Sequence, residues 1–366
     1  MPESAAPRVL LLSAAPTSAG HVYRVEHAAA GLASRGFEPR VLPLEDPGAA
    51  AAVAAADVVT VFRGRWGEPL ERVHAAARAR GVPLAIDTDD LLFDEELLRR
   101  GAVALLDRLP EEERGRWIGD AALFRAALAS ADAAVVTTPA LAAAARAVVP
   151  RVHVVPNGVD GRMIAAADAA RRAAKPSTAD GLVRVGFASG TPTHHRDFAT
   201  IAPVLGELLA RRADVRLVIV GILDVADVAE LRPHAARIEI RPRVPLESLE
   251  TELARFDLNL APLEAGNPFC ECKSAIRVTA AALVGVPSVA AAVGALPDAV
   301  IDGRTGVVAS DAAGWLAALE ALVADPARRA AMGEAARVDV TARFGPEAGA
   351  SALERAYRAI LAAGRR

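Results

Sequence analysis

The chain has 366 residues, enough for two ordinary cores, and 53% of them are apolar. Aromatic residues supply only 4%, so Val, Leu, Ile and Ala must build the cores, which is typical of parallel sheets covered by Ala-rich helices. A net charge of −3 without a long basic run gives no electrostatic footprint for nucleic acid. Cys270 and Cys272 lack the partners that a disulfide scaffold or a zinc site would need.

We expect a cytoplasmic protein without a signal peptide or membrane span. Val9–Leu12 is followed by small residues, which predicts a short buried strand rather than a secretory segment. The stretch 278–297 is uncharged and as long as the roughly 20 residues of a membrane helix. However, Gly285-Val286-Pro287 interrupts it, so it predicts a buried helix, a tight turn and a buried strand.

Apolar strand-like runs alternate with Ala-rich helical stretches in the first half. This β-α-β alternation predicts a parallel sheet with right-handed crossovers. The predicted strands are Val9–Leu12, Glu38–Leu42, Val58–Phe62, Leu84–Ile86, Ala133–Thr137 and Arg151–Val155. The predicted helices are His21–Arg35, Pro69–Arg80, Trp117–Ser130 and Pro139–Val149.

The same pattern restarts in the second half. Its predicted strands are Leu182–Ala188, Val215–Val220, Ile238–Ile240, Leu258–Ala261, Ser288–Ala291 and Val307–Ala309. Its predicted helices are Phe198–Arg211, Leu246–Arg255, Ser274–Val284 and Ala312–Ala324, and the chain ends in two or more helices, the last being Pro346–Ala363.

We therefore predict an α/β fold with two Rossmann-like domains facing each other across a cleft. The N-terminal domain covers residues 1–160, a connection 161–181, the C-terminal domain 182–345, and a final helix, 346–366, packs back on the N-terminal domain. One large sheet, or a dehydrogenase with a separate substrate domain, are the alternatives.

Two loops of the second half have the composition of anion sites. The predicted strand ending at Ala188 runs into Ser189-Gly190-Thr191-Pro192-Thr193-His194-His195-Arg196-Asp197 and then a helix. Free backbone N–H groups and the helix dipole favour an anion at such a turn, and Arg196 adds a cationic fork. A polar turn with Asp197 as the helix cap is the structural alternative.

The second loop runs from Glu264 through Asn267-Pro268-Phe269 to Lys273-Ser274, between a predicted strand and a predicted helix. Lys273 and Arg277 would lie one turn apart near the helix N-terminus, where positive charge is unfavourable unless an anion binds. Ion pairs with Glu264 or Glu271 would also explain why Lys273 and Arg277 lie there. Both loops follow strands, and ligands bind at that edge of an open α/β sheet.

At this point the chain resembles family 4 of the glycosyltransferases, which have the GT-B architecture. The resemblance spans nearly the whole chain and depends on motifs in the family's order: the loop and helix from Gly20 to Phe37, Ile86-Asp87-Thr88-Asp89-Asp90-Leu91, Val154-Val155-Pro156-Asn157-Gly158-Val159-Asp160, Ser189-Gly190-Thr191 with Arg196-Asp197-Phe198, Asn267-Pro268-Phe269 with Lys273-Ser274, Gly285-Val286-Pro287, and Asp302-Gly303-Arg304-Thr305-Gly306-Val307.

The resemblance implies a retaining glycosyltransferase that uses a nucleoside-diphosphate sugar and no metal or other cofactor. The Ala-, Arg-, Gly- and Pro-rich composition suggests a GC-rich bacterial genome, and we expect a small-molecule acceptor from bacterial specialised metabolism. Arg196 and Lys273 would be catalytic by neutralising the departing diphosphate. The implied donor-binding residues are Ser189, Gly190, Thr191, Glu264, Asn267, Phe269, Ser274, Arg277 and Thr279. The implied acceptor-binding residues are Gly20, His21, Tyr23, Arg24, Asp89 and Asp90.

Several other side chains have either a role in the cleft or an ordinary structural role. Arg63, Arg65 and Trp66 follow the third predicted strand and can line the cleft. His194 and His195 are expected to be loop residues rather than metal ligands, because no third partner has a convincing spacing. We expect a monomer or a homodimer.

One departure from the family concerns its two donor-site glutamates. Their positions are occupied by Cys272 and Ala280, and in the family the second glutamate contacts the donor ribose. Glu264 can partly replace the first, and only Thr279 is near enough to replace the second. Three explanations are possible: the nucleotide is bound differently, the donor is unusual, or activity has been lost. A catalytically silent nucleotide-sugar binder is therefore an alternative function. A non-hydrolysing epimerase or phosphorylase on the same architecture is another.

Overall fold

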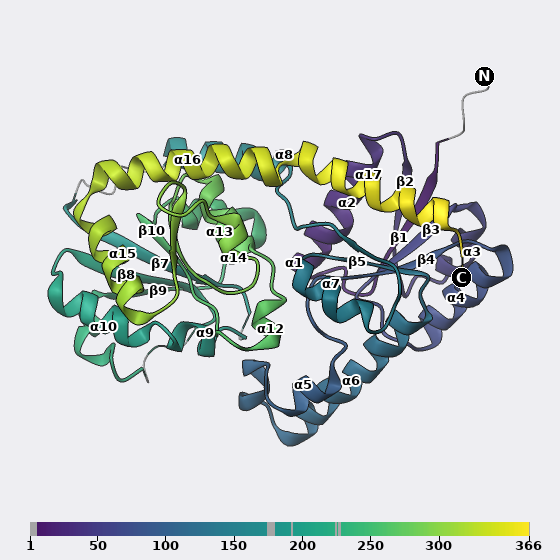
Figure 1. Cartoon of the computed structure of the whole chain (residues 1–366), viewed down its shortest axis with the longest axis horizontal. Coiled ribbons are helices and arrows are strands. Elements are labelled where there is room, and N and C mark those ends of the chain that lie inside the picture. Colours follow the sequence, from purple (N-terminus) through teal and green to yellow (C-terminus); the bar gives the residue numbers. More distant parts are fainter. Residues whose placement is uncertain (1–5, 174–179, 192, 224, 226–227, 366) are drawn as a thin grey trace.

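The computed structural model describes residues 6–173, 180–191, 193–223, 225 and 228–365. Residues 174–179 of the predicted connection and Pro192 of the first predicted anion loop lie outside them. The described chain forms two parallel six-stranded sheets, each with its own helices, lying side by side (Figure 1). This confirms two Rossmann-like domains and excludes a single large sheet.

All twelve predicted strands are present, with ends shifted by at most a few residues. The first sheet consists of β1 (Arg8–Ser13), β2 (Glu38–Pro43), β3 (Val58–Phe62), β4 (Leu84–Thr88), β5 (Ala133–Val136) and β6 (Val152–Val154). The second consists of β7 (Val183–Ser189), β8 (Val215–Gly221), β9 (Ile238–Arg241), β10 (Leu258–Ala261), β11 (Ser288–Ala291) and β12 (Gly306–Ala309). Central strands such as β3, β5 and β10 are buried along their whole length, which is why they are uninterrupted apolar runs.

The strand order of each sheet reverses at one place. The first sheet runs β2-β1-β3-β4-β5-β6, and the second runs β12-β11-β10-β7-β8-β9. The reversal lies between β1 and β3 in the first sheet and between β7 and β10 in the second. Ligands of open α/β sheets bind beyond the carboxyl ends of the strands at this reversal. A ligand is therefore expected at the loops that follow β1, β3, β7 and β10.

Short helices and one π-helix cover the first sheet. They are α1 (Ala19–His21), the π-helix η1 (Val22–Glu26), α2 (His27–Ala33), α3 (Ala49–Ala52), α4 (Glu68–Arg80), α5 (Glu95–Arg99), α6 (Glu111–Ser130) and α7 (Pro139–Arg146), with 3₁₀ turns η2 (Val53–Ala55) and η3 (Ala104–Arg108). The helix predicted to begin at Trp117 begins at Glu111 instead, because three glutamates in its first turn favour a helix N-terminus. The bounds of the short helix α5 were not predicted; Asp94 caps it, as the structural alternative for this region expected, through a hydrogen bond from the backbone N–H of Leu97.

The second sheet is covered by α8 (Gly161–Ala173), α9 (His195–Ala199), α10 (Ala202–Arg211), α11 (Leu249–Leu253), α12 (Pro268–Glu271), α13 (Ile276–Leu283), α14 (Leu296–Ala299), α15 (Ala312–Ala324) and α16 (Pro326–Phe344), with 3₁₀ turns η5 (Arg232–Arg237) and η6 (Leu246–Ser248). Two predictions were wrong in detail. The predicted helix Phe198–Arg211 is divided into α9 and α10 before Pro203, and the helix predicted from Ser274 begins only at Ile276. Lys273 therefore lies between α12 and α13 rather than in a first helical turn.

The stretch 278–297 contains the end of α13, a turn at Gly285 with φ of +76°, and the buried strand β11, as predicted. Within the described residues, no helix combines the length and apolarity needed to cross a bilayer.

The chain passes between the domains twice, at neighbouring points. Residues 157–160 lead into α8, and Phe344 and Gly345 join α16 to α17 (Pro346–Ala363). Val159 donates its backbone N–H to the carbonyl of Phe344 at 2.8 Å, and a Cβ on Gly158 would lie only 2.7 Å from that carbonyl oxygen. Gly158 is therefore required by this close approach.

The last helix, α17, packs back on the first domain, as predicted (Figure 1). Leu353, Tyr357 and Ile360 join an apolar cluster with Val9 and Leu11 of β1. The Tyr357 hydroxyl donates to Thr60 Oγ1 at 3.0 Å.

Candidate active site

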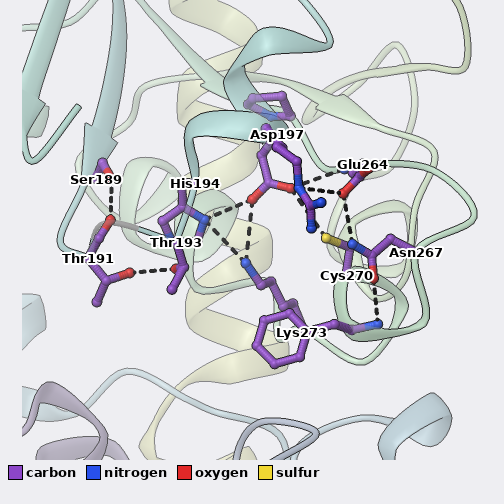
Figure 2. A network of polar contacts seen from close by, with 12 residues as sticks. Ser189, Thr191, Thr193, His194, Asp197, Glu264, Asn267, Cys270 and Lys273 are labelled. Atoms are coloured by element: carbon purple, nitrogen blue, oxygen red, sulfur yellow. Dashed lines mark hydrogen bonds and ion pairs between the residues drawn. The ribbon is translucent and has the colours of Figure 1, made fainter. Parts of the chain in front are cut away.

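Polar side chains meet beyond β7 and β10, the strands that flank the reversal in the second sheet. Asp197 is at the centre of this network and is 2% exposed (Figure 2). One carboxylate oxygen accepts a hydrogen bond from His194 Nδ1 at 2.8 Å and lies 3.4 Å from Lys273 Nζ. The other accepts from the backbone N–H of Glu264 at 3.1 Å and from Cys270 Sγ at 3.3 Å. Asp197 thus joins the two predicted anion loops.

The electrostatics of this network fix its protonation states. Burial would raise the pKa of Asp197, but the hydrogen bond from His194 and the charge of Lys273 hold it well below its usual range. Burial, with the charges of Arg277 and Lys273, lowers the pKa of His194 to about 3. His194 is therefore neutral near pH 7. Because a carboxylate only accepts, Nδ1 of His194 carries the proton and Nε2 is left as an acceptor.

Lys273 is held as a buried cation at the centre of this arrangement. Its Nζ lies 3.3 Å from His194 Nδ1 and 5.2 Å from the centroid of the Phe269 ring. The chain contains only two lysines among 42 basic residues, so a compact ammonium is used here where arginine is used almost everywhere else.

Arg196 and Asn267 lie at the edge of the network, and both bind the first domain. Arg196 Nη2 donates to the carbonyl of Gly101 at 2.6 Å, and its Nε lies 3.5 Å from Glu264 Oε2. Asn267 Nδ2 donates to the carbonyl of Ala102 at 2.7 Å and to Glu264 Oε2 at 2.8 Å. The network therefore extends across the domain boundary.

Several predicted donor residues have other partners. Ser189 donates its hydroxyl to the carbonyl of Thr191 at 2.9 Å, Thr279 donates to the carbonyl of Ile276, and Phe269 is buried in an apolar cluster with the first domain. Arg277 does not lie beside Lys273 on one helical face. Its guanidinium stacks over Phe187 at 4.7 Å and donates to the carbonyl of Pro262. Gly190 and Thr191 are exposed.

Ala280, at the position expected to contact the donor ribose, lies in apolar surroundings. It is 5% exposed and belongs to an apolar cluster with Met163 of α8, Val284 and Tyr23 of the first domain. The missing glutamate is therefore matched by an apolar surrounding, and Thr279, whose hydroxyl is bound within its own helix, does not replace it.

The predicted acceptor residues divide into two groups. Gly20, His21, Asp89 and Asp90 lie beyond β1 and β4, with Asp89 buried and the other three partly exposed, whereas Tyr23 and Arg24 are turned into the interior. Arg24 forms a bidentate pair with Asp87 at 2.8 Å and donates to the carbonyl of Val155 at 2.6 Å. The structure therefore places Arg24 in the interior rather than at an open acceptor surface, because Asp87 is a buried carboxylate that requires a counter-charge.

Tyr23 is also turned inward. Its side chain joins the cluster that contains Ala280, and its hydroxyl is buried without a hydrogen-bond partner among the residues that the structure describes. Burial, with the charges of Glu250 and Asp160, raises the pKa of Tyr23 well above its usual value.

Arg63 binds both the buried Asp89 and the partly exposed Asp90. It has a φ of +51°, a left-handed conformation that is rare for residues with side chains. Its Nε donates to Asp89 at 2.6 Å and its Nη2 to Asp90 at 3.2 Å. A Cβ on Gly20 would lie 2.9 Å from Asp89 Oδ2, so only glycine allows the first loop to approach so closely.

Asp90 is near enough to the second domain to interact with the charge of Lys273. Burial and the neighbouring Asp89 raise its pKa, while Arg63 and Lys273 oppose this rise. Its side chain is still 31% exposed, so it is available to a ligand.

Asn157 links Arg24 of the first domain to Ser274 of the second domain. Its Oδ1 accepts from Arg24 Nη1 at 3.2 Å, and its Nδ2 donates to Ser274 Oγ at 3.2 Å. Thr138 adds a further interdomain contact by donating to the carbonyl of Cys272 at 3.0 Å. The domains are therefore closed on each other at this point.

Sequence reasoning missed the role of four residues. Asp197 was considered only as a helix cap, and His194 only as a loop residue. Asp87 and Asn157 were noted only as parts of motifs. The spacing of His194 and Asp197, one turn apart at a helix start, was the available signal. Within the described residues, no group of three or more His, Cys, Asp or Glu side chains is arranged to hold a metal ion.

The histidine gives a testable pH dependence. Its pKa of about 3 in the folded protein lies below the ~6.5 of an exposed histidine, so the unfolded chain binds more protons between these values. As pH falls from 6.5 to 4.5, His194 should therefore cost up to about 1.4 kcal/mol of stability per pH unit. The lowered pKa of Asp197 acts only below ~4, where the unfolded carboxylate starts to bind protons.

Urea unfolding of wild type and His194→Gln at several pH values between 7 and 4.5 measures this. The variant should lose less stability on acidification than wild type does, while His234→Gln should behave as wild type. Equal pH slopes in wild type and His194→Gln would show that the histidine is not buried in its neutral form.

Comparison with known proteins gives one family match. Residues 184–325 match the model of the family described as "Glycosyl transferases group 1". Two curated relatives are D-inositol 3-phosphate glycosyltransferases. The protein from Corynebacterium aurimucosum is 51% identical over 75 residues, which are 20% of this chain and 18% of that one. The protein from Segniliparus rotundus is 31% identical over 225 residues, which are 58% of this chain and 48% of that one. The chain thus spans about half, or less, of the length of these relatives.

Solved structures are similar over nearly the whole chain. The sucrose-phosphate synthase from Thermosynechococcus elongatus is 18% identical with a TM-score of 0.63, covering 98% of this chain and 100% of that one. The HepE protein of Anabaena in complex with UDP-glucose is 16% identical with a TM-score of 0.60, covering 96% and 99%. At these identities the likeness establishes the two-domain GT-B fold.

Proposed function

We propose that this protein is a retaining glycosyltransferase of the family 4 type, which moves a sugar from a nucleoside diphosphate to a small-molecule acceptor. One observation carries the proposal. The buried Lys273 and the neutral His194 meet at the strand reversal of the second sheet, inside the segment that matches the glycosyltransferase family model. A buried ammonium at this edge is suited to a diphosphate.

In the proposed reaction the bond between the anomeric carbon and the diphosphate oxygen breaks, and a bond from that carbon to the acceptor oxygen forms. The acceptor's proton passes to the departing diphosphate, so no protein base is required. Lys273 and Arg196 neutralise the charge that develops on the leaving group. Gly190 and Thr191 are exposed in the loop that follows β7, and we assign their backbone amides to the phosphates as well.

The acceptor is assigned to the surface around Gly20, His21, Asp89 and Asp90. These carboxylates accept hydrogen bonds from hydroxyl groups, so a polyol suits this surface. Two relatives are named for an inositol phosphate acceptor, which makes cyclitols and their phosphates the first acceptors to test. A place in bacterial specialised metabolism is part of this proposal.

Incubation with UDP-, GDP-, ADP- and dTDP-hexoses, each with myo-inositol, inositol phosphates and other sugar alcohols, tests the function. Formation of a glycosylated product together with free nucleoside diphosphate is expected, and its anomeric configuration by NMR should match that of the donor. Inversion of configuration would overturn the proposed mechanism.

A catalytically silent nucleotide-sugar binder is the second candidate, and the apolar surrounding of Ala280 favours it. Calorimetry with the four nucleoside diphosphates separates the two. Binding without turnover of any donor supports the silent form. A reaction that changes the donor without an acceptor would indicate an epimerase, and one that needs only inorganic phosphate would indicate a phosphorylase.

A further inference from the structure

One segment of the first domain binds Arg196, a cation that we assign to the donor diphosphate. We define the strap as residues 95–108, which comprise α5, a turn at Gly101 and η3. Gly101 has a φ of +73° and ends α5, so the chain reverses there and the carbonyls of Gly101 and Ala102 face the second domain. Figure 1 shows α5 beside α9 and α12.

The strap contacts both terminal nitrogens of Arg196, while Nε has no hydrogen-bond partner among the described residues. The Gly101 carbonyl accepts from Nη2 at 2.6 Å, and Asp107 Oδ2 lies 3.6 Å from Nη1. Asp107 Oδ2 also lies 3.8 Å from His195 Nε2. With Glu264 at 3.5 Å from Nε, two carboxylates surround one guanidinium. A diphosphate brought to Arg196 would therefore meet excess negative charge unless Asp107 moves away.

Apolar packing and a second hydrogen bond hold the strap in place. Phe269 of α12 is buried in one cluster with Leu98 and Val103 of the strap. Ala102 accepts from Asn267 at 2.7 Å.

We propose that the strap is a self-inhibitory element: in the ligand-free protein it binds Arg196 and Asn267, and a nucleoside diphosphate must displace it. This inference depends on the proposed function, because it assumes a diphosphate at Arg196. The strap then competes with the ligand, so weakening the strap strengthens ligand binding.

The test compares wild type, Asp107→Asn and the control Glu111→Gln, which removes an equal charge from an exposed position close by on α6. Isothermal titration calorimetry is done with UDP, GDP, ADP and dTDP. The diphosphate that binds wild type should bind Asp107→Asn about two- to five-fold more tightly, the range that removal of a partly exposed ion pair gives. Glu111→Gln should bind as wild type does. Unchanged or weaker binding by Asp107→Asn overturns the proposal.

Hydrogen exchange separates failure of the strap from failure of the function. In the protein without ligand, backbone amides of residues 95–108 should exchange faster in Asp107→Asn than in wild type. In wild type, the diphosphate should accelerate the same amides. If a diphosphate binds but does not change this exchange, the strap proposal fails while the proposed function stands. If no diphosphate binds either protein, the proposed function fails, and the strap as a competitor of diphosphate fails with it.

Discussion

Replacing Lys273 with methionine should lower kcat/KM for the sugar nucleotide at least about 100-fold, with most of the loss in kcat. Lys273 is 9% exposed and is the cation closest to Asp197 and His194. Its charge is needed most when the diphosphate leaves, so the effect falls on the transition state more than on binding. Methionine retains the packing of the side chain over Phe269. Steady-state kinetics with whichever of the four sugar nucleotides the protein uses measure the effect.

Two further variants sharpen this result. Arg304→Met removes an exposed cation of the same domain and should leave turnover unchanged. Lys273→Arg should still lose about ten-fold or more, because the planar guanidinium does not fit the space of a compact ammonium between His194 and Phe269. Thermal melting of each variant checks that the fold is retained. Wild-type turnover by Lys273→Met would contradict the assignment of the leaving-group site.

The largest effect on stability is expected for Arg24→Met, which should cost about 3–5 kcal/mol. The change leaves the buried carboxylate of Asp87 without its bidentate partner and removes the donors to Val155 and Asn157. Burial opposes the charge of Arg24, but Asp87 keeps the pKa of Arg24 above its usual value. Burial raises the pKa of Asp87 and the charge of Arg24 opposes that rise, so without Arg24 nothing of comparable strength would stabilise the carboxylate. Denaturant unfolding followed by circular dichroism measures the loss.

The double variant Arg24→Met/Asp87→Leu should recover part of this loss, since no unpaired charge then remains in the core. Arg116→Met breaks an exposed ion pair with Glu112 and should cost less than 1 kcal/mol. If Arg24→Met were no worse than Arg116→Met, Arg24 would not be a structural residue and its expected role toward the acceptor would return to consideration.

The strand pattern could be predicted because it depends on local composition. Runs such as Val58–Phe62 and Leu258–Ala261 are buried on both faces, so they must be continuously apolar and are visible without any tertiary information. Helix boundaries were less accurate. The start of α13 depends on how Asn267 and Pro268 begin the separate helix α12, and such capping is decided by contacts that a periodicity does not contain.

The sequence by itself predicted two parallel sheets and the loops that follow their strands, and it indicated which residues of those loops are candidates for holding an anion. Tertiary structure decided which side chains are free to do so. Arg24 and Tyr23 are turned inward, Arg277 is bound over Phe187, and Arg196 is engaged by the strap. It also made Asp197 the centre of the network, since its partners come from two loops more than 60 residues apart in the chain. The physical reason is that burial and charge pairing depend on distances across the fold, whereas a sequence pattern fixes only what each segment can form locally.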